Sequence, residues 1–108
     1  MEECCEIILK ELNKLDMNAE MLTLDGTFPA VYGRTEENSK KLLIYGHYDV
    51  QSPEPLDKWK YDPFSAEIIE GHIIARGATD DKGNLFVNIK AAETLKEILG
   101  KLPNVLKF

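Results

Sequence analysis

Two short stretches of this 108-residue sequence carry side chains that can do chemistry, and the first contains His47 and Asp49. It follows a continuous apolar run at residues 42–45. In an extended chain, residues two apart share a face, so the carboxylate of Asp49 can lie beside the imidazole of His47. A carboxylate in that place fixes the tautomer and orientation of a zinc-binding histidine. A capping histidine followed by a turn aspartate would give the same residue pattern, so both interpretations stay open at this point.

The second stretch runs from Arg76 to Gly83 and contains the neighbouring aspartates Asp80 and Asp81. Carboxylates are favoured at the start of a helix by the helix dipole and by free backbone N–H groups, which is the simpler interpretation of Asp81. Two carboxylates close to a histidine can instead hold a divalent metal, since zinc accepts imidazole nitrogen and carboxylate oxygen. His47 and Asp80 are 33 positions apart, so their spacing does not show that they meet.

The hydrophobic pattern around these stretches predicts an α/β fold, because helical and extended segments alternate along the chain. The run at residues 42–45 is continuous, which is typical of a central strand covered on both faces. We therefore expect His47 at the carboxyl end of a central strand, where open α/β sheets bind ligands. The other predicted elements are helices at residues 2–16 and 81–99, strands at 21–24, 30–34 and from 105 onward, a hairpin at 66–76, and loops at 36–41 and 51–64.

The composition argues against several classes of partner. The formal net charge of -6 argues against nucleic acid, because phosphate binding needs clustered lysine and arginine. Cys4 and Cys5 are adjacent and are the only cysteines, so we expect no disulfide and a reducing compartment. We see no signal peptide, and no segment has the roughly 20 apolar residues that cross a bilayer. These observations predict a soluble, cytoplasmic protein with no membrane partner.

Several blocks of the sequence, taken in order, resemble the signature of the co-catalytic zinc amidohydrolases and peptidases. That family includes carnosinases and other dipeptidases, aminoacylase, glutamate carboxypeptidase and succinyl-diaminopimelate desuccinylase. Val50-Gln51 resembles the dipeptidase branch, although Ser52 stands where that branch usually has proline. The resemblance covers nearly the whole chain. The matching blocks are residues 46–51, Trp59 with residues 62–64, Gly71, and residues 76–83.

The resemblance implies a role for each residue that matches a family motif. His47 would bind one zinc ion, Asp80 would bridge two, and Asp49 would have a catalytic role by orienting the ring of His47. The peptide bond between Asp80 and Asp81 resembles one that is cis in the family. The implied cofactor is two zinc ions per complete active site, for which cobalt or manganese can substitute. The implied substrate is a dipeptide or an N-acyl amino acid, whose amide bond is cleaved by a metal-activated water.

The resemblance also implies that residues 1–108 are the N-terminal part of a zinc-peptidase catalytic domain, with a mixed β-sheet flanked by helices. In the family, the general base is the first glutamate of a Glu-Glu pair just after the strand that corresponds to residues 105–108. That pair, the remaining metal ligands and the lid or dimerisation domain are absent from this sequence. We therefore expect this polypeptide alone to lack hydrolase activity and to bind zinc weakly, because two ligands do not complete sites that each need about four.

Two other interpretations stay open at the level of sequence. One is a non-catalytic binding module, or a subunit of a split enzyme, whose open strand edges bind a complementing C-terminal polypeptide. The other is a mononuclear metal-binding protein that uses His47, Asp49 and Asp80. The distance between the imidazole of His47 and the carboxylate of Asp80 decides whether either metal site exists.

Overall fold

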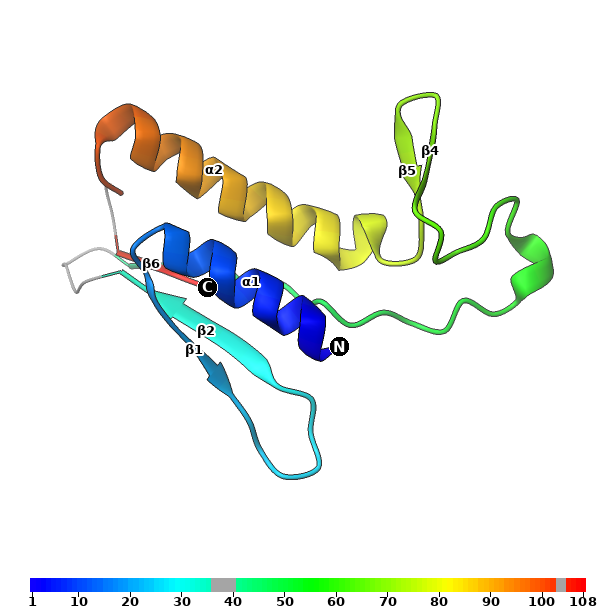
Figure 1. Ribbon diagram of the computed structural model, residues 1–108, viewed down its shortest axis with the longest axis horizontal. Helices are drawn as coiled ribbons and strands as arrows, with labels where there is room; N and C mark the ends of the chain where they lie inside the picture. The colour runs from blue at the N-terminus through cyan, green and yellow to red at the C-terminus, as the bar shows by residue number, and fades with distance from the viewer. Residues whose placement is uncertain (36–40, 103–104) are drawn as a thin grey trace.

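The computed structural model describes residues 1–35, 41–102 and 105–108, so the loop predicted at 36–41 lies outside these residues except for Lys41. The elements are, in chain order, α1 (Glu2–Lys14), β1 (Asn18–Leu22), β2 (Ala30–Arg34), β3 (Lys41–Leu43), a 3₁₀ turn (Leu56–Lys58), β4 (Glu67–Ile69), β5 (His72–Ile74), a helical turn (Ala78–Lys82), α2 (Gly83–Leu99) and β6 (Val105–Lys107). Four strands form one mixed sheet in the order β1-β2-β6-β3, and β4 and β5 form a separate hairpin (Figure 1). The predicted α/β fold with a mixed sheet is confirmed.

The first helix packs on the hairpin of β1 and β2. All five residues of β1 pair with β2 in antiparallel register, and the strand predicted at 30–34 is confirmed. β1 begins at Asn18 rather than at residue 21, because pairing with β2 outweighs the low strand propensity of that asparagine. α1 can approach β2 closely because Gly33 has no side chain. A Cβ at that position would lie only 2.9 Å from Cδ1 of Leu12. The backbone of β2 is thereby fixed against α1.

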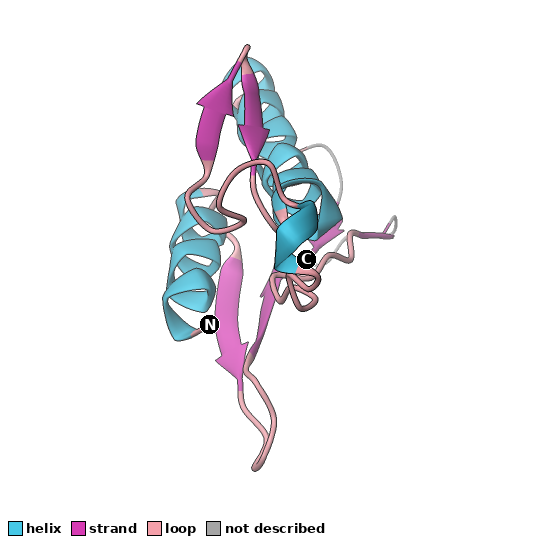
Figure 2. Ribbon diagram, turned by 90° about the vertical axis from the view of Figure 1, so that its right-hand side faces the viewer, coloured by secondary structure: helices cyan, strands magenta, loops and turns pink. Residues whose placement is uncertain are grey.

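A small hydrophobic core joins α1, α2 and β6. The two helices lie side by side, and α1 lies along the hairpin of β1 and β2 (Figures 1 and 2). An ion pair between Lys90 of α2 and Glu11 of α1, at 2.7 Å, ties the helices together at the edge of this core. The core therefore holds the start of α2 in a fixed position relative to the sheet. Its buried residues are Leu12, Leu15, Met17, Ile89, Ala92 and Leu106.

Both long helices occur where the hydrophobic periodicity predicts them. α2 ends at Gly100, whose φ of 71° lies in the left-handed region that glycine adopts readily. α1 ends at Lys14, two residues before the predicted end, and α2 begins at Gly83, two residues after the predicted start. The residues between 78 and 82 form a separate helical turn instead of the first turn of α2.

The apolar run at residues 42–45 is not a buried central strand in this structure, which corrects the prediction. β3 takes up only the first part of the run and pairs with β6 in parallel register at the edge of the sheet. Leu43 is 68% exposed and Tyr45 is 85% exposed. A strand is covered only by what packs on it, and β6 is the one sheet partner of β3 among the described residues.

Residues 51–64 form an irregular loop, as their prolines predict, apart from the one 3₁₀ turn. Trp59 holds this loop together, because its Nε1 donates a hydrogen bond of 2.7 Å to the main-chain oxygen of Pro53. The guanidinium of Arg76 lies 4.9 Å from the centre of the Trp59 ring, which is cation–π distance. The loop is thereby attached to the segment that leads into the second chemical stretch. The predicted hairpin at 66–76 is present as β4 and β5.

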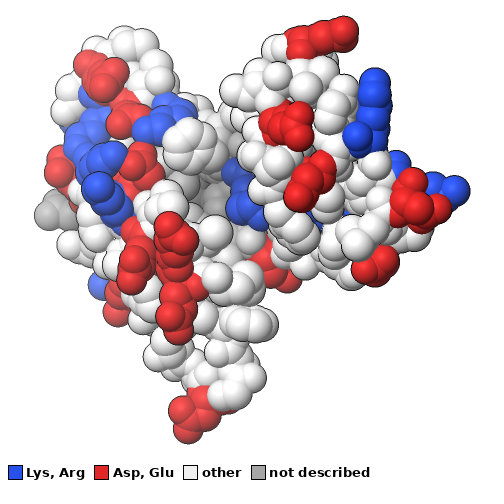
Figure 3. Space-filling model, turned by 45° about the vertical axis from the view of Figure 1, so that its right-hand side comes forward, with Lys and Arg blue, Asp and Glu red and all other residues white. Residues whose placement is uncertain are grey.

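The chain is more open than a compact domain of its length. Its radius of gyration is 16.0 Å, whereas about 13 Å is expected for a compact chain of this size. Ile98 of α2 is 74% exposed and Ile68 of β4 is 73% exposed. Figure 3 shows broad uncharged areas between groups of acidic and basic side chains on one face. Within the three described segments, no helix combines the length and the apolar character that a membrane crossing requires.

Candidate metal centre

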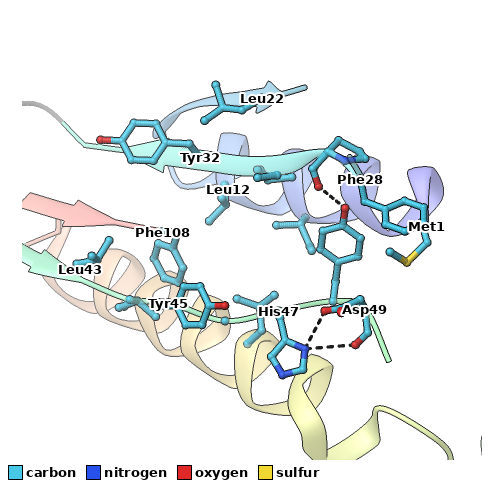
Figure 4. A pocket seen from close by; sticks show the side chains of 18 residues that line it. Met1, Leu12, Leu22, Phe28, Tyr32, Leu43, Tyr45, His47, Asp49 and Phe108 are labelled. Atoms are coloured by element: carbon cyan, nitrogen blue, oxygen red, sulfur yellow. Dashed lines mark hydrogen bonds and ion pairs between the residues drawn. The ribbon is translucent and has the colours of Figure 1, made fainter. Parts of the chain in front are cut away.

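His47 lies on the segment that leaves the sheet after β3, and two aspartates contact its ring. Nδ1 of the imidazole is 3.0 Å from Oδ1 of Asp49 and 3.3 Å from the main-chain oxygen of the same residue (Figure 4). Nε2, on the other side of the ring, is 2.9 Å from Oδ1 of Asp80. The fold therefore brings together all three residues that the sequence singles out.

The second aspartate of the pair does not cap a helix. Asp80 and Asp81 lie in the helical turn before α2, and the peptide bond between them is cis, as the family resemblance implies. Oδ2 of Asp81 accepts a hydrogen bond of 3.2 Å from the backbone N–H of His47. Within the described residues, neither this turn nor α2 begins with a side-chain cap, so the N-capping interpretation of Asp81 is wrong. Both aspartates reach residue 47 instead, one through its ring and one through its backbone.

Two glycines allow this close approach. A Cβ at Gly46 would lie 2.9 Å from Oδ2 of Asp81, so a larger residue would press on the carboxylate that holds His47. Gly83, the first residue of α2, faces the carbonyl oxygen of Ala78, and a Cβ there would overlap that oxygen. Because neither residue has a side chain, the segment after β3 can pack against the start of α2.

The surrounding charges favour a cation at His47. Burial lowers the pKa of its imidazole, but hydrogen bonds to the carbonyl of Asp49 and to the carboxylates of Asp80 and Asp49 outweigh burial, so the pKa is raised above 6.5. The side chains are open to water, with exposures of 37% for His47 and 73% for Asp80. An exposed imidazole between two carboxylates attracts positive charge, whether that charge is a proton or a metal ion.

The contact between His47 and Asp80 fits a zinc ion with little rearrangement. Zinc binds nitrogen at about 2.0–2.1 Å and carboxylate oxygen at about 2.0–2.2 Å, so two ligands of a tetrahedral ion lie about 3.3 Å apart. The two atoms here are 2.9 Å apart, a few tenths of an ångström closer. Asp49 on the opposite nitrogen is the partner that a metal-binding histidine usually has. The donor types and their spacing are therefore suitable for a metal.

The described residues supply two ligands rather than a complete site. In residues 1–35, 41–102 and 105–108, no three His, Cys, Asp or Glu side chains are grouped so that they could hold a metal ion. The alternative mononuclear site made of His47, Asp49 and Asp80 is therefore wrong. The two aspartates contact opposite nitrogens of one ring, so a single ion cannot bind all three side chains.

Tyr48 anchors the same segment, although no motif singles it out. Its hydroxyl donates a hydrogen bond to the main-chain oxygen of Pro29, and the thiol of Cys5 lies 3.6 Å from that oxygen. Burial, and then the neighbouring Cys5, raises the pKa of Tyr48 to about 12, so the hydroxyl keeps the proton that it donates. In an extended chain, side chains alternate, so Tyr48 points away from the face shared by His47 and Asp49. This alternation could have identified Tyr48 as an anchoring residue from the sequence.

Comparison with known proteins relates this chain to characterised enzymes. The family model described as "Peptidase family M20/M25/M40" matches residues 43–108. The chain is 35% identical to the Cys-Gly metallodipeptidase dug1 of Schizosaccharomyces pombe, over 89% of this chain and 23% of that protein. It is 34% identical to the Beta-Ala-His dipeptidase of Rattus norvegicus, over 76% of this chain and 17% of that protein. It is 29% identical to the succinyl-diaminopimelate desuccinylase of Dechloromonas aromatica, over 97% of this chain and 28% of that protein.

Two solved structures share the fold. Human carnosine dipeptidase 1 superposes with a TM-score of 0.79 at 25% identity, covering 95% of this chain and 24% of that one. The dipeptidase Dug1p of Saccharomyces cerevisiae gives a TM-score of 0.75 at 26% identity, covering 94% and 24%. The chain thus spans about a quarter of the length of these relatives. Since the family model covers the segment that carries His47, Asp49 and Asp80, together with α2 and β6, the chain belongs to peptidase family M20/M25/M40.

Proposed function

We propose that residues 1–108 are the N-terminal part of the catalytic domain of a zinc-dependent hydrolase, which cleaves the amide bond of a dipeptide or an N-acyl amino acid. Family membership supports this, as do relatives whose names are dipeptidase and desuccinylase. The observation that carries the proposal is His47, with Asp49 on one ring nitrogen and Asp80 on the other. A cytoplasmic location is part of the proposal, since Cys4 and Cys5 are free thiols.

In this proposal, His47 and Asp80 hold zinc, and Asp49 keeps the ring turned toward it. When Asp49 accepts the proton of Nδ1, Nε2 is left with the lone pair that a metal needs. Asp80 has two carboxylate oxygens and can therefore serve two ions. Asp81 holds the backbone of His47 in place through its N–H. Zinc, when bound, supplies a Lewis acid that polarises the amide carbonyl and activates water.

The proposal includes the expectation that these residues do not hydrolyse amides by themselves. Two ligands leave zinc short of the four that it usually has. The other ligands and the general base would come from polypeptide outside these 108 residues, either continuous with the chain or supplied by a complementing partner. Four-ligand zinc sites are worth about 10–16 kcal/mol, so two ligands should give about 5–8 kcal/mol, or a Kd between about 1 µM and 0.2 mM.

Calorimetric titration of the metal-free chain with zinc chloride tests the ligand assignment. The unmodified chain should bind zinc in this weak range, and His47→Gln or Asp80→Asn should weaken binding at least about tenfold. His72→Gln is the matched control, because His72 is the other histidine and its Nδ1 bonds to the main-chain oxygen of Glu70. Assays with Cys-Gly and Beta-Ala-His as substrates should show no turnover.

Three results would contradict the proposal. Tight binding of two zinc ions together with dipeptide turnover would show that the chain carries a complete site. Unchanged zinc affinity in both His47→Gln and Asp80→Asn, with circular dichroism showing an intact fold, would remove the ligand assignment. A loss of affinity in His72→Gln as large as that in His47→Gln would do the same.

A further inference from the structure

The loop at residues 51–64 is fastened to the second chemical stretch at both of its ends. Just before its start, Val50 lies so close to Gly77 that a Cβ on the glycine would be 2.5 Å from Cγ1 of Val50. Near its end, the main-chain oxygen of the buried Pro63 accepts a hydrogen bond of 2.7 Å from the N–H of Arg76. Arg76 and Gly77 therefore close the loop, which extends past the start of α2 between these two contacts (Figure 1).

The middle of the loop is attached to the same place by a cation–π contact. The guanidinium of Arg76 lies 4.9 Å from the centre of the Trp59 ring. Within the described residues, Nε of Arg76 is buried without a hydrogen-bond partner, so the ring face is its compensating neighbour. The ring itself is held in one orientation, because its Nε1 donates to the oxygen of Pro53 at 2.7 Å. We call Trp59 and Arg76 the clamp.

The clamp is connected to the metal centre through the turn that carries Asp80. The carbonyl of Gly77, next to the clamp, accepts the backbone N–H of Lys82 at 3.1 Å. A Cβ at Gly77 would also collide with the side chain of Lys82, so the turn packs tightly on this glycine. On the other side of Gly77, Val50 belongs to the segment that carries His47. A displacement at the clamp would therefore reach both segments of the metal centre.

We propose that Trp59 and Arg76 are positioning residues for the metal centre, because the clamp keeps the turn that carries Asp80 docked on the segment that carries His47. Without the clamp, the turn opens locally more often. Opening breaks the hydrogen bond of 3.2 Å from the N–H of His47 to Asp81 and separates Asp80 from the imidazole. This inference rests on the proposed function only for its effect on zinc, since the docked turn is a property of the metal-free chain.

Hydrogen exchange of the His47 amide, measured by NMR on the metal-free chain, tests the clamp. Trp59→Leu should speed this exchange about three- to thirtyfold, the range expected for the loss of a cation–π contact. The amide of Ile89, in the buried core, is the internal reference, because a purely structural role would speed its exchange through global unfolding instead. Tyr61→Leu is the matched control, since Lys60 lies 5.3 Å from the Tyr61 ring and this cation–π pair joins neighbouring residues of the same loop.

Two conservative variants separate the ring face from the other contacts of the clamp. Trp59→Phe keeps a ring face for the guanidinium but loses the hydrogen bond to Pro53, so it should restore part of the protection of His47. Arg76→Lys keeps the charge but loses the flat guanidinium, so it should behave like Trp59→Leu. Calorimetric titration with zinc should show a Kd raised by at most the same factor in both of these clamp-breaking variants, because only the docked fraction binds.

The possible results distinguish this inference from the proposed function. Unchanged exchange of His47 in Trp59→Leu, or equal changes in Trp59→Leu and Tyr61→Leu, would overturn the clamp. Faster exchange of Ile89 alone, or full protection of His47 in Arg76→Lys, would reduce Trp59 to a packing residue and overturn it as well. Absence of zinc binding by the unmodified chain would contradict the proposed function alone, since the exchange of His47 is measured without metal.

Discussion

Nε2 of His47 lies 2.9 Å from Oδ1 of Asp80, although the two residues are 33 positions apart. This contact joins the segment after β3 to the helical turn before α2. Asp81 reinforces it by accepting the backbone N–H of His47 at 3.2 Å. With Asp49 on the opposite nitrogen, the ring is held from several directions before any ion binds, and such preorganisation reduces the cost of ordering the ligands on binding.

Asp49→Asn should weaken zinc binding by about 10–100-fold, because an amide no longer fixes the ring of His47 as a carboxylate does. Asp49 is 65% exposed, so the fold should be unchanged. Calorimetric titration with zinc measures the effect. Asp25→Asn removes the same charge from an exposed turn and serves as the control. Equal losses in the two variants would mean that only net charge matters, and no loss in Asp49→Asn would exclude a positioning role.

Glu11→Gln should make the chain less stable at neutral pH and less sensitive to acid. Hydrogen bonds from Lys14 and then Lys90 lower the pKa of Glu11 from 4.5 to about 2. Because the folded pKa is the lower one, this stabilisation is fully present above pH 4.5 and is lost as the pH falls toward 2. Both lysines are partly exposed, so solvent screening reduces the loss at pH 7 to about 1–2 kcal/mol.

Urea unfolding followed by circular dichroism between pH 7 and pH 2 measures this effect of Glu11. Glu97→Gln, at an exposed position of α2, is the matched control and should change little. If Glu11→Gln and the unmodified chain lost stability in parallel on acidification, the pairing of Glu11 with Lys90 across the two helices would have no energetic role.

Leu12→Ala should lower the free energy of unfolding by about 2–5 kcal/mol. Leu12 is 1% exposed, and its side chain packs directly against Gly33. Truncating that side chain would open a cavity between α1 and β2. Leu24→Ala makes the same chemical change at a residue that is 76% exposed, and it should cost less than about 0.5 kcal/mol. Similar costs for the two changes, measured by urea unfolding, would show that α1 does not pack on the sheet as described.

Gly83→Ala should destabilise the chain, although alanine is normally the better helix former by about 1 kcal/mol. The φ of Gly83 is -64°, which suits any residue, but a Cβ there would overlap the carbonyl oxygen of Ala78. The clash should outweigh the propensity and cost about 1–3 kcal/mol, with weaker zinc binding as well. Gly26→Ala is the control for a glycine with open space around it: its φ of +76° should cost some stability through backbone strain, but it should leave zinc binding intact. A stabilised Gly83→Ala would contradict the close approach.

Local patterns were enough to predict the helices, the strand at β2 and the placement of Asp49 beside His47. A helical face is set by residue spacing within a few turns. Gly100 ends α2 because glycine readily adopts the left-handed φ needed there, which is a property of that residue alone. Two residues in one extended segment share a face wherever that segment lies. These features depend on neighbours in the chain, so the amino-acid sequence by itself determined them.

Contacts between distant segments were decided only by the tertiary structure. Asp80 meets His47 because the turn before α2 packs against Gly46, and no periodicity encodes that approach. Asp81 matches a helix cap by sequence, yet the fold directs its carboxylate to the backbone of His47. The apolar run that includes Leu43 predicts a buried strand, but burial depends on which elements pack on it, and β3 lies at the exposed edge of the sheet. Spacing along the chain therefore determined which residues share a face, whereas packing between segments decided which faces meet.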